Sequence, residues 1–145
     1  MLQTMLAREY RTRGTLAQFH ASDAFARGLM GPVGSGKSTA CAMEIFERAR
    51  QQAPDSEGVR KTRWAVIRNT YPDLRTTTLK TWKEWFPEHL FSINYTSPIT
   101  CRLKGALGDG THIDAEVIFI ALDKPKDVRK LLSLEITGAW LNEAR

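Results

Sequence analysis

Apolar and polar positions follow helical and strand periods in turn along the chain. Residues 37–53 predict a helix, because one of its faces is apolar at spacings i, i+3, i+4 and i+7. That face consists of Ala42, Ile45, Phe46 and Ala49. Glu44 and Arg48 form a favourable i,i+4 pair on another face of the same helix. Residues 63–69 predict a strand with a buried centre, and 117–122 form a continuous apolar run. Such a run is typical of a strand buried on both faces.

The rest of the chain continues this alternation of helices and strands. Residues 76–86 predict a helix that places Trp82 in the core and ends at Pro87, after a turn at 70–73. The remaining elements are expected at 93–122 (β structure, with a glycine-rich hairpin turn at 105–110), 127–134 (helix) and 136–141 (strand). We therefore expect the α/β class, a sandwich around a mainly parallel central sheet.

Residues 31–38 read GPVGSGKS and satisfy the pattern G-x-x-x-x-G-K-[ST] at every fixed position. This pattern is typical of a loop whose backbone N–H groups surround a polyphosphate, because glycines let the backbone approach the phosphate oxygens. Lys37 is expected to reach the β- and γ-phosphates, and the Ser38 hydroxyl to bind Mg²⁺. The predicted nucleotide-binding residues are Gly31, Pro32, Val33, Gly34, Ser35, Gly36, Lys37, Ser38 and Thr39.

Both flanks of this loop agree with a nucleotide site. A mostly apolar run at 24–30 is expected to form the strand before the loop, and the 37–53 helix follows directly. That helix points its positive end at the bound anion. The alternative, a glycine-rich turn before an ordinary helix, is disfavoured because all fixed positions and both flanks agree. The sequence thus predicts an NTP-binding protein, with an ATPase as the first interpretation.

An ATPase also needs an acidic residue at the end of another buried strand, to help hold Mg²⁺ and to activate water. Asp123 follows the apolar run 117–122, but Lys124 comes next in place of a glutamate. Glu143 offers a general base after a shorter apolar run, and neutral Asn142 before it holds only a metal-bound water. The residues alone leave both positions open, and Asp123 is equally suited to a turn or a helix N-cap.

Length and composition limit the other possibilities. The 145 residues correspond to one domain, with 42% hydrophobic and 26% charged residues, as in ordinary soluble proteins. No apolar run approaches the length of about 18 residues that a membrane span needs. Cys41 and Cys101 are isolated and lack metal-ligand spacing, which fits a reducing cytoplasm. The net charge of +5 permits a polyanionic partner without establishing one.

Taken together, these motifs resemble the N-terminal ATPase domain of tailed-phage terminase large subunits, the motors that package DNA into procapsids. Many NTPases share the loop at 31–38, so the later blocks in their order are the more specific part. The matching blocks are FHASD (19–23), GPVGSGKS (31–38), RNTYPDL (68–74), the tryptophan-bearing 76–87, ALDKP (121–125), LLSLE (131–135) and GAWLNEA (138–144).

The resemblance implies that the acidic strand end falls on Asn142 and Glu143. Glu143 is then the expected catalytic base, with Lys37 as the catalytic cation. Asn142 contributes to the metal site through a water, and Asp123 becomes a structural turn residue. The implied cofactors are ATP and Mg²⁺.

The resemblance also implies an adenine contact upstream of the loop and an arginine that acts on the phosphates. Gln18 or Phe19 fills the first role, with Gln18 as the predicted nucleotide-binding residue. Some terminases carry the arginine inside the loop, but positions 32–35 contain none. Arg27 and Arg68 are the candidates from elsewhere in the chain.

The family's large subunit continues beyond this point, so we expect a polar segment at 1–18 and a partial ATPase domain at 19–145, without the nuclease domain. The implied partners are double-stranded DNA, the portal protein and the terminase small subunit, with a homo-oligomeric ring at full length. The expected setting is the host cytoplasm, with no membrane. We expect this chain alone to bind ATP weakly and to hydrolyse it poorly. The alternatives are another P-loop NTPase such as a kinase, or a nucleotide-binding remnant without hydrolysis.

Overall fold

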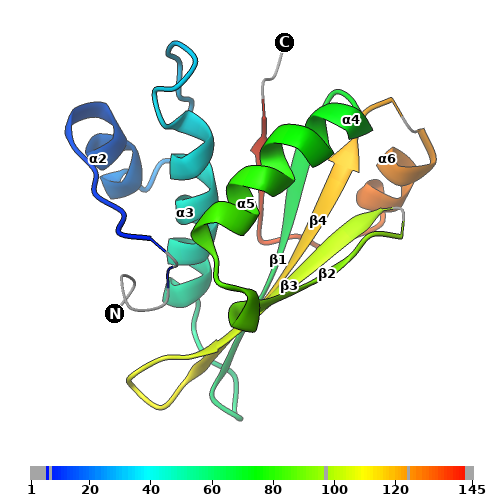
Figure 1. Cartoon of the computed structure of the whole chain (residues 1–145). Helices are drawn as coiled ribbons and strands as arrows, with labels where there is room; N and C mark the ends of the chain where they lie inside the picture. The colour runs from blue at the N-terminus through cyan, green and yellow to red at the C-terminus, as the bar shows by residue number, and fades with distance from the viewer. Residues whose placement is uncertain (1–5, 7, 97, 124, 143–145) are drawn as a thin grey trace.

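The computed structural model describes residues 6, 8–96, 98–123 and 125–142. Within these residues it is an α/β structure with a five-stranded sheet in the order β2-β3-β4-β1-β5 (Figure 1). The strands are β1 (Val59–Arg68), β2 (Phe91–Asn94), β3 (Ile99–Ala106), β4 (His112–Ala121) and β5 (Gly138–Leu141). The helical elements are α2 (Gly14–Ala21), α3 (Lys37–Gln51), α4 (Tyr71–Asp73), η1 (Leu74–Thr78), α5 (Leu79–Trp85), η2 (Glu88–Leu90) and α6 (Pro125–Leu132).

The α/β class is confirmed, but the sheet is mixed, so the expectation of a mainly parallel sheet holds only for β4, β1 and β5. β1 pairs in parallel with β4 and β5, whereas β2–β3 and β3–β4 are antiparallel. The glycine-rich turn explains the antiparallel pairing of β3 with β4. Leu107 N donates to Thr111 O at 2.8 Å, and Gly110 takes a φ of 86°. A connection this short joins antiparallel neighbours, because a parallel pair needs a long crossover.

Both faces of the central strands are covered, as the continuous apolar run at 117–122 predicted. The prediction is wrong only for Leu122, which follows the end of β4 and is 51% exposed. On one face, Trp64, Val66 and Phe119 join the main core beneath α3 and α5. On the other face, Ile118 and Ile120 pack with residues of and just after α6. Each fully buried side chain of this size contributes on the order of 2 kcal/mol to folding. The sheet therefore lies between helices on both sides.

The helix predicted at 76–86 begins earlier and runs through α4, η1 and α5. Thr70 caps it, because its hydroxyl oxygen accepts from Asp73 N at 3.3 Å. The turn predicted at 70–73 is thus the first helical turn, which tolerates Pro72 because early helical N–H groups need no partner. Trp82 is fully buried. Its ring centroid lies 4.6 Å from that of Phe86 and 5.7 Å from that of Phe119. The assignment of Trp82 to the core is confirmed.

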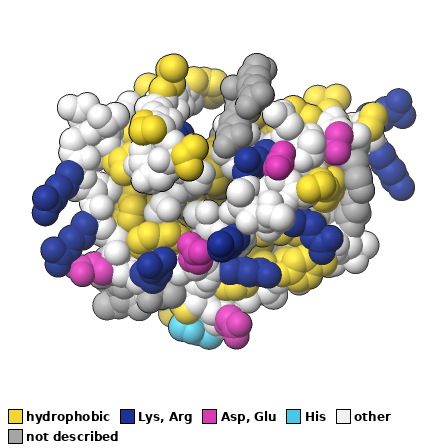
Figure 2. Space-filling view, turned by 45° about the horizontal axis from the view of Figure 1, so that its top comes forward, with side chains coloured by type: hydrophobic (Ala, Val, Ile, Leu, Met, Phe, Trp, Pro, Cys, Tyr) yellow, Lys and Arg dark blue, Asp and Glu magenta, His cyan; other side chains and the backbone are white. Residues whose placement is uncertain are grey.

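The segment 24–30 is not a strand, which corrects the prediction made from its apolar character. A strand needs a neighbour for its backbone hydrogen bonds, and this segment pairs with none of the described strands. Phe25 and Met30 lie open to solvent, and Figure 2 shows hydrophobic side chains at the surface of the molecule. The chain here is fastened instead by Arg27, which binds Glu44 on α3.

Among the described strands, β5 lies at one edge of the sheet and pairs with β1. Its last residue, Leu141, is 61% exposed.

Among the described residues, no helix combines the length and apolar character needed to cross a bilayer.

Candidate nucleotide site

The glycine-rich loop lies at one end of the sheet (Figure 1). It leads directly into α3, which packs against β1 and β4 on the main-core face. The parallel strands β1, β4 and β5 direct their carboxyl ends toward this same end of the molecule. In open α/β sheets, ligands bind outside the carboxyl ends of parallel strands. The loop and the ends of these strands therefore face a common region.

The loop backbone uses its glycines where other residues would be strained. Gly34 and Gly36 have φ angles of 80° and 84°, in the left-handed region that favours glycine. Ser35 N donates to Pro32 O at 3.3 Å, which closes the turn. A Cβ at Gly31 would stand 3.1 Å from Ser35 Oγ, tighter than an ordinary contact. The glycine positions of the motif thus match the needs of this backbone.

The start of α3 presents backbone donors without protein acceptors. The first helical hydrogen bond joins Ala40 N to Gly36 O at 2.9 Å. The N–H groups of Lys37, Ser38 and Thr39 have no acceptor among the described residues, and Gly36 supplies no side-chain cap. Such donors at a helix N-terminus bind anions, because the helix dipole adds to their charge. This end of α3 fits a phosphate group.

Lys37 folds back over the loop. Its Nζ donates to Gly31 O at 2.5 Å, to Pro32 O at 2.8 Å and to Ser35 Oγ at 3.3 Å. These acceptors carry no charge, so a phosphate oxygen would make a stronger, charge-assisted bond with the same ammonium. The side chain lies within reach of an anion held by the loop.

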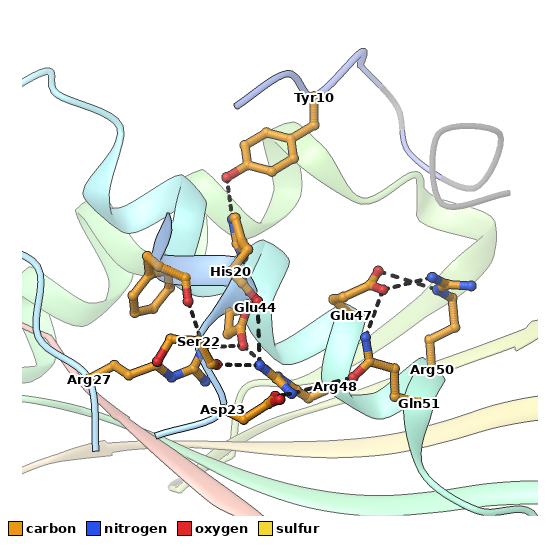
Figure 3. Close-up of polar contacts among 11 residues, drawn as sticks. Tyr10, His20, Ser22, Asp23, Arg27, Glu44, Glu47, Arg48, Arg50 and Gln51 are labelled. Carbon is orange, nitrogen blue, oxygen red and sulfur yellow. Dashed lines mark hydrogen bonds and ion pairs between the residues drawn. The ribbon is translucent and has the colours of Figure 1, made fainter. Parts of the chain in front are cut away.

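A cluster of charged side chains joins α3 to the segment before the loop, and only its Glu44–Arg48 pair was predicted (Figure 3). Its centre is Glu44, which is only 7% exposed. The Glu44 carboxylate lies 2.5 Å from His20 Nδ1, 2.6 Å from Arg27 Nη1 and 2.7 Å from Arg48 Nε. Arg48 also donates to Ser22 O at 2.7 Å. The Glu44–Arg48 pair therefore belongs to a buried cluster that fastens the segment before the loop to α3.

The pKa values of Glu44 and of Tyr10, whose hydroxyl contacts His20 of the cluster, shift in opposite directions. Burial alone would raise the pKa of Glu44, but hydrogen bonds from Arg48, His20 and Arg27 outweigh it and lower this pKa below its ordinary value of 4.5. Burial raises the pKa of Tyr10 to about 12, helped by the negative charge of Glu44. Glu44 is thus held ionised and Tyr10 neutral.

The upstream candidates lie in different surroundings. Gln18 is exposed on α2, and its side chain makes no hydrogen bond within the described residues. Leu16 of α2 approaches the loop instead, since its Cδ1 lies 3.5 Å from where a Gly36 Cβ would be. The Arg27 guanidinium lies over Phe19, with Arg27 Cζ 4.9 Å from the centroid of the Phe19 ring. Arg27 is held by Glu44 and Phe19 O, and Arg68 donates to Thr77 Oγ1. These contacts commit both arginines to the fold.

The ends of β4 and β5 carry the two alternatives for the acidic position. Asp123 is an exposed turn residue whose N donates to Asn69 O at 3.1 Å. Asn142 is buried directly after β5, and its Nδ2 donates to Thr78 Oγ1 at 2.8 Å. Asn142 N also donates to Ile67 O at 2.8 Å, which extends the pairing with β1. Glu143 lies outside the described residues.

No family model, no curated protein and no solved structure matches the chain.

Proposed function

We propose that this chain is the ATP-binding part of a viral DNA-packaging motor, similar to the ATPase domain of a terminase large subunit. The observation that carries the nucleotide assignment is the start of α3. Three backbone donors without acceptors and the ammonium of Lys37 meet there at one glycine loop. The assignment to a packaging motor is supported by the order of the sequence blocks that resemble terminases. Its setting would be the cytoplasm of the infected host.

In this proposal the residues take distinct roles. The loop amides hold the polyphosphate, and Lys37 neutralises charge that develops on it during phosphoryl transfer. Ser38 and Asn142 are the residues that would hold Mg²⁺, the second through a water. Mg²⁺ supplies charge neutralisation on the phosphate oxygens when it is bound. Glu143 orients and polarises the attacking water.

Titration with a fluorescent ATP analogue and Mg²⁺ tests the nucleotide assignment. We expect Lys37→Ala to weaken binding at least about tenfold, because a charge-assisted phosphate contact is lost. Lys126→Ala, an exposed lysine on α6, is the matched control and is expected to bind as the wild type does. Equal affinity of the wild type and Lys37→Ala would refute the assignment.

Phosphate release tests the motor assignment. In a large subunit that contains this chain, double-stranded DNA should stimulate release, and Glu143→Gln should abolish release while nucleotide binding persists. Transfer of the phosphate to a small acceptor would indicate a kinase instead. Binding without release in the presence of DNA would indicate a nucleotide-binding protein that does not hydrolyse ATP.

A further inference from the structure

The outward face of η1 and α5 carries positive charge that the described residues do not neutralise. Arg75, Lys80 and Lys83 are exposed, and none of them has an ion-pair partner in the described part of the chain. Together with Thr76 and Glu84 they line a shallow depression of about 480 Å³. We call the surface formed by Arg75, Thr76, Lys80 and Lys83 the basic face.

One carboxylate, that of Glu84, also lines this depression. It lies 3.9 Å from Nη1 of Arg8, a cation outside the basic face, in a solvent-exposed pair. The inward face of the same helix is apolar, with Leu79 and Trp82 in the core. Core packing therefore fixes the helix and directs the cationic side chains to solvent. Figure 2 shows Lys and Arg side chains in several groups over the surface, with fewer carboxylates among them.

Two of these cations converge on one aromatic ring. The Arg75 guanidinium lies 5.8 Å from the Tyr95 ring centroid, and Lys83 Nζ lies 5.1 Å from it. Cation–π attraction holds each of them there at the cost of repulsion between like charges. Both cations therefore lie on one part of the surface, which attracts anions such as phosphate groups.

We propose that the basic face binds the phosphate backbone of double-stranded DNA. Arg, Lys and Thr are residue types that contact DNA phosphates and position a protein on the duplex. Binding of single strands requires aromatic rings on which bases stack. Tyr95 is a single ring, 46% exposed and contacted by two cations, whereas Trp85 is half-buried with Arg8 lying 5.5 Å from its ring centroid. The basic face thus offers three cations but only one exposed ring, too few for a row of stacked bases, which favours the duplex.

The helix that carries the basic face also contacts the strand ends at the candidate nucleotide site. Thr77 accepts from Arg68 at the end of β1, and Thr78 accepts from Asn142 after β5. DNA on the outward face and nucleotide at the strand ends would therefore act on the same helix. This inference deepens the proposed function. The coupling between DNA and nucleotide rests on that proposed function, whereas the DNA contact itself rests on the charges of the basic face.

The experiment measures affinity for a short fluorescent DNA duplex as a function of salt. The basic-face variant carries Lys80→Gln and Lys83→Gln together. The control, the α6 variant, carries Lys126→Gln and Lys130→Gln, which remove the same charge from exposed positions on α6. Each lost phosphate contact lowers the slope of log affinity against log salt by about 0.9. Between about 50 and 200 mM salt, the affinity of the basic-face variant should therefore fall about tenfold less than that of the wild type. The α6 variant should keep the wild-type slope.

Three results would overturn the proposal: equal loss of slope in both variants, no duplex binding by the wild type, or tighter binding of the single strand than of the duplex. ATP-analogue binding is measured on the same proteins. A basic-face variant that binds nucleotide normally but loses DNA supports the basic face. If nucleotide fails to bind while the basic face retains DNA, only the proposed function fails.

Discussion

His20 Nδ1 and Glu44 Oε2 lie 2.5 Å apart, although the two residues are 24 positions apart in the sequence. On its other side, His20 Nε2 lies 2.7 Å from the Tyr10 hydroxyl (Figure 3). The helix that carries His20, α2, has eight residues, no buried residue and no side-chain cap. A helix this short is marginal alone, so it depends on contacts with the rest of the fold. Glu44 thus holds in place the chain that leads into the glycine loop.

Glu44→Gln should lower the free energy of unfolding by on the order of 3 kcal/mol, because it removes the carboxylate that half-buried Arg27 and Arg48 share and leaves Arg48 only the exposed Asp23 as an ion-pair partner among the described residues. The measurement is the urea midpoint followed by circular dichroism. Glu47→Gln is the matched control on the same helix, where half-buried Glu47 pairs with Arg50 and Gln51 within α3. Its cost should stay below about 1 kcal/mol. Equal midpoints for the two variants would contradict the role of Glu44.

The lowered pKa of Glu44 gives the stability a dependence on acid. A carboxyl whose pKa is lower in the folded protein contributes stability above its unfolded value, which is near 4.5. That contribution disappears as the pH falls through the folded pKa. The difference in stability between wild type and Glu44→Gln should therefore be constant near neutral pH and shrink below about pH 4. Urea titrations across this range measure it, and a difference that does not change with pH would count against ionisation as the cause.

The sequence predicted the loop and α3 because both are local. The pattern at 31–38 fixes glycine positions, and the apolar spacing of Ala42, Ile45 and Phe46 depends on one helix alone. The Glu44 cluster could not be predicted, since its contacts with His20 and Arg27 join segments far apart in the chain. Likewise, the apolar run at 24–30 did not reveal whether a neighbouring strand exists for it to pair with.

Gly36→Ala should weaken nucleotide binding and also lower stability. Its φ of 84° costs a residue with a side chain about 1–2 kcal/mol, whereas the new Cβ would make only an ordinary contact with Leu16 Cδ1, at 3.5 Å. Gly14→Ala provides the control, because Gly14 also has a positive φ but has nothing within 4 Å of a Cβ. Both variants should lose stability in thermal unfolding, whereas only Gly36→Ala should lose affinity for the ATP analogue. Parallel loss of affinity in Gly14→Ala would assign the effect to general destabilisation.

The thiols should react slowly in the folded protein. Burial raises the pKa of Cys101 to about 12 and that of Cys41 to about 11, so few thiolates form at neutral pH. Alkylation with iodoacetamide, followed by mass spectrometry, should label both thiols rapidly in urea. Without urea, Cys41 should react before Cys101, because Cys101 is buried and Cys41 is half-buried. Rapid labelling of Cys101 in the native protein would contradict its position in the core.

Gly138→Ala tests the close approach of β5 to β1. A Cβ at Gly138 would stand 2.6 Å from Trp64 Cζ3, so the backbone or the indole must move. The indole is fixed, because its Nε1 donates to Thr62 Oγ1 at 2.8 Å and its ring is buried. Overpacking of this kind costs about 1–3 kcal/mol, and the urea midpoint should fall accordingly. Gly28→Ala, with open space around the new Cβ, should leave the midpoint nearly unchanged. Asn142 of the candidate nucleotide site follows β5 directly. We therefore also expect Gly138→Ala to alter the affinity for nucleotide. A substitution whose effect stays within the core would lower stability but leave this affinity unchanged.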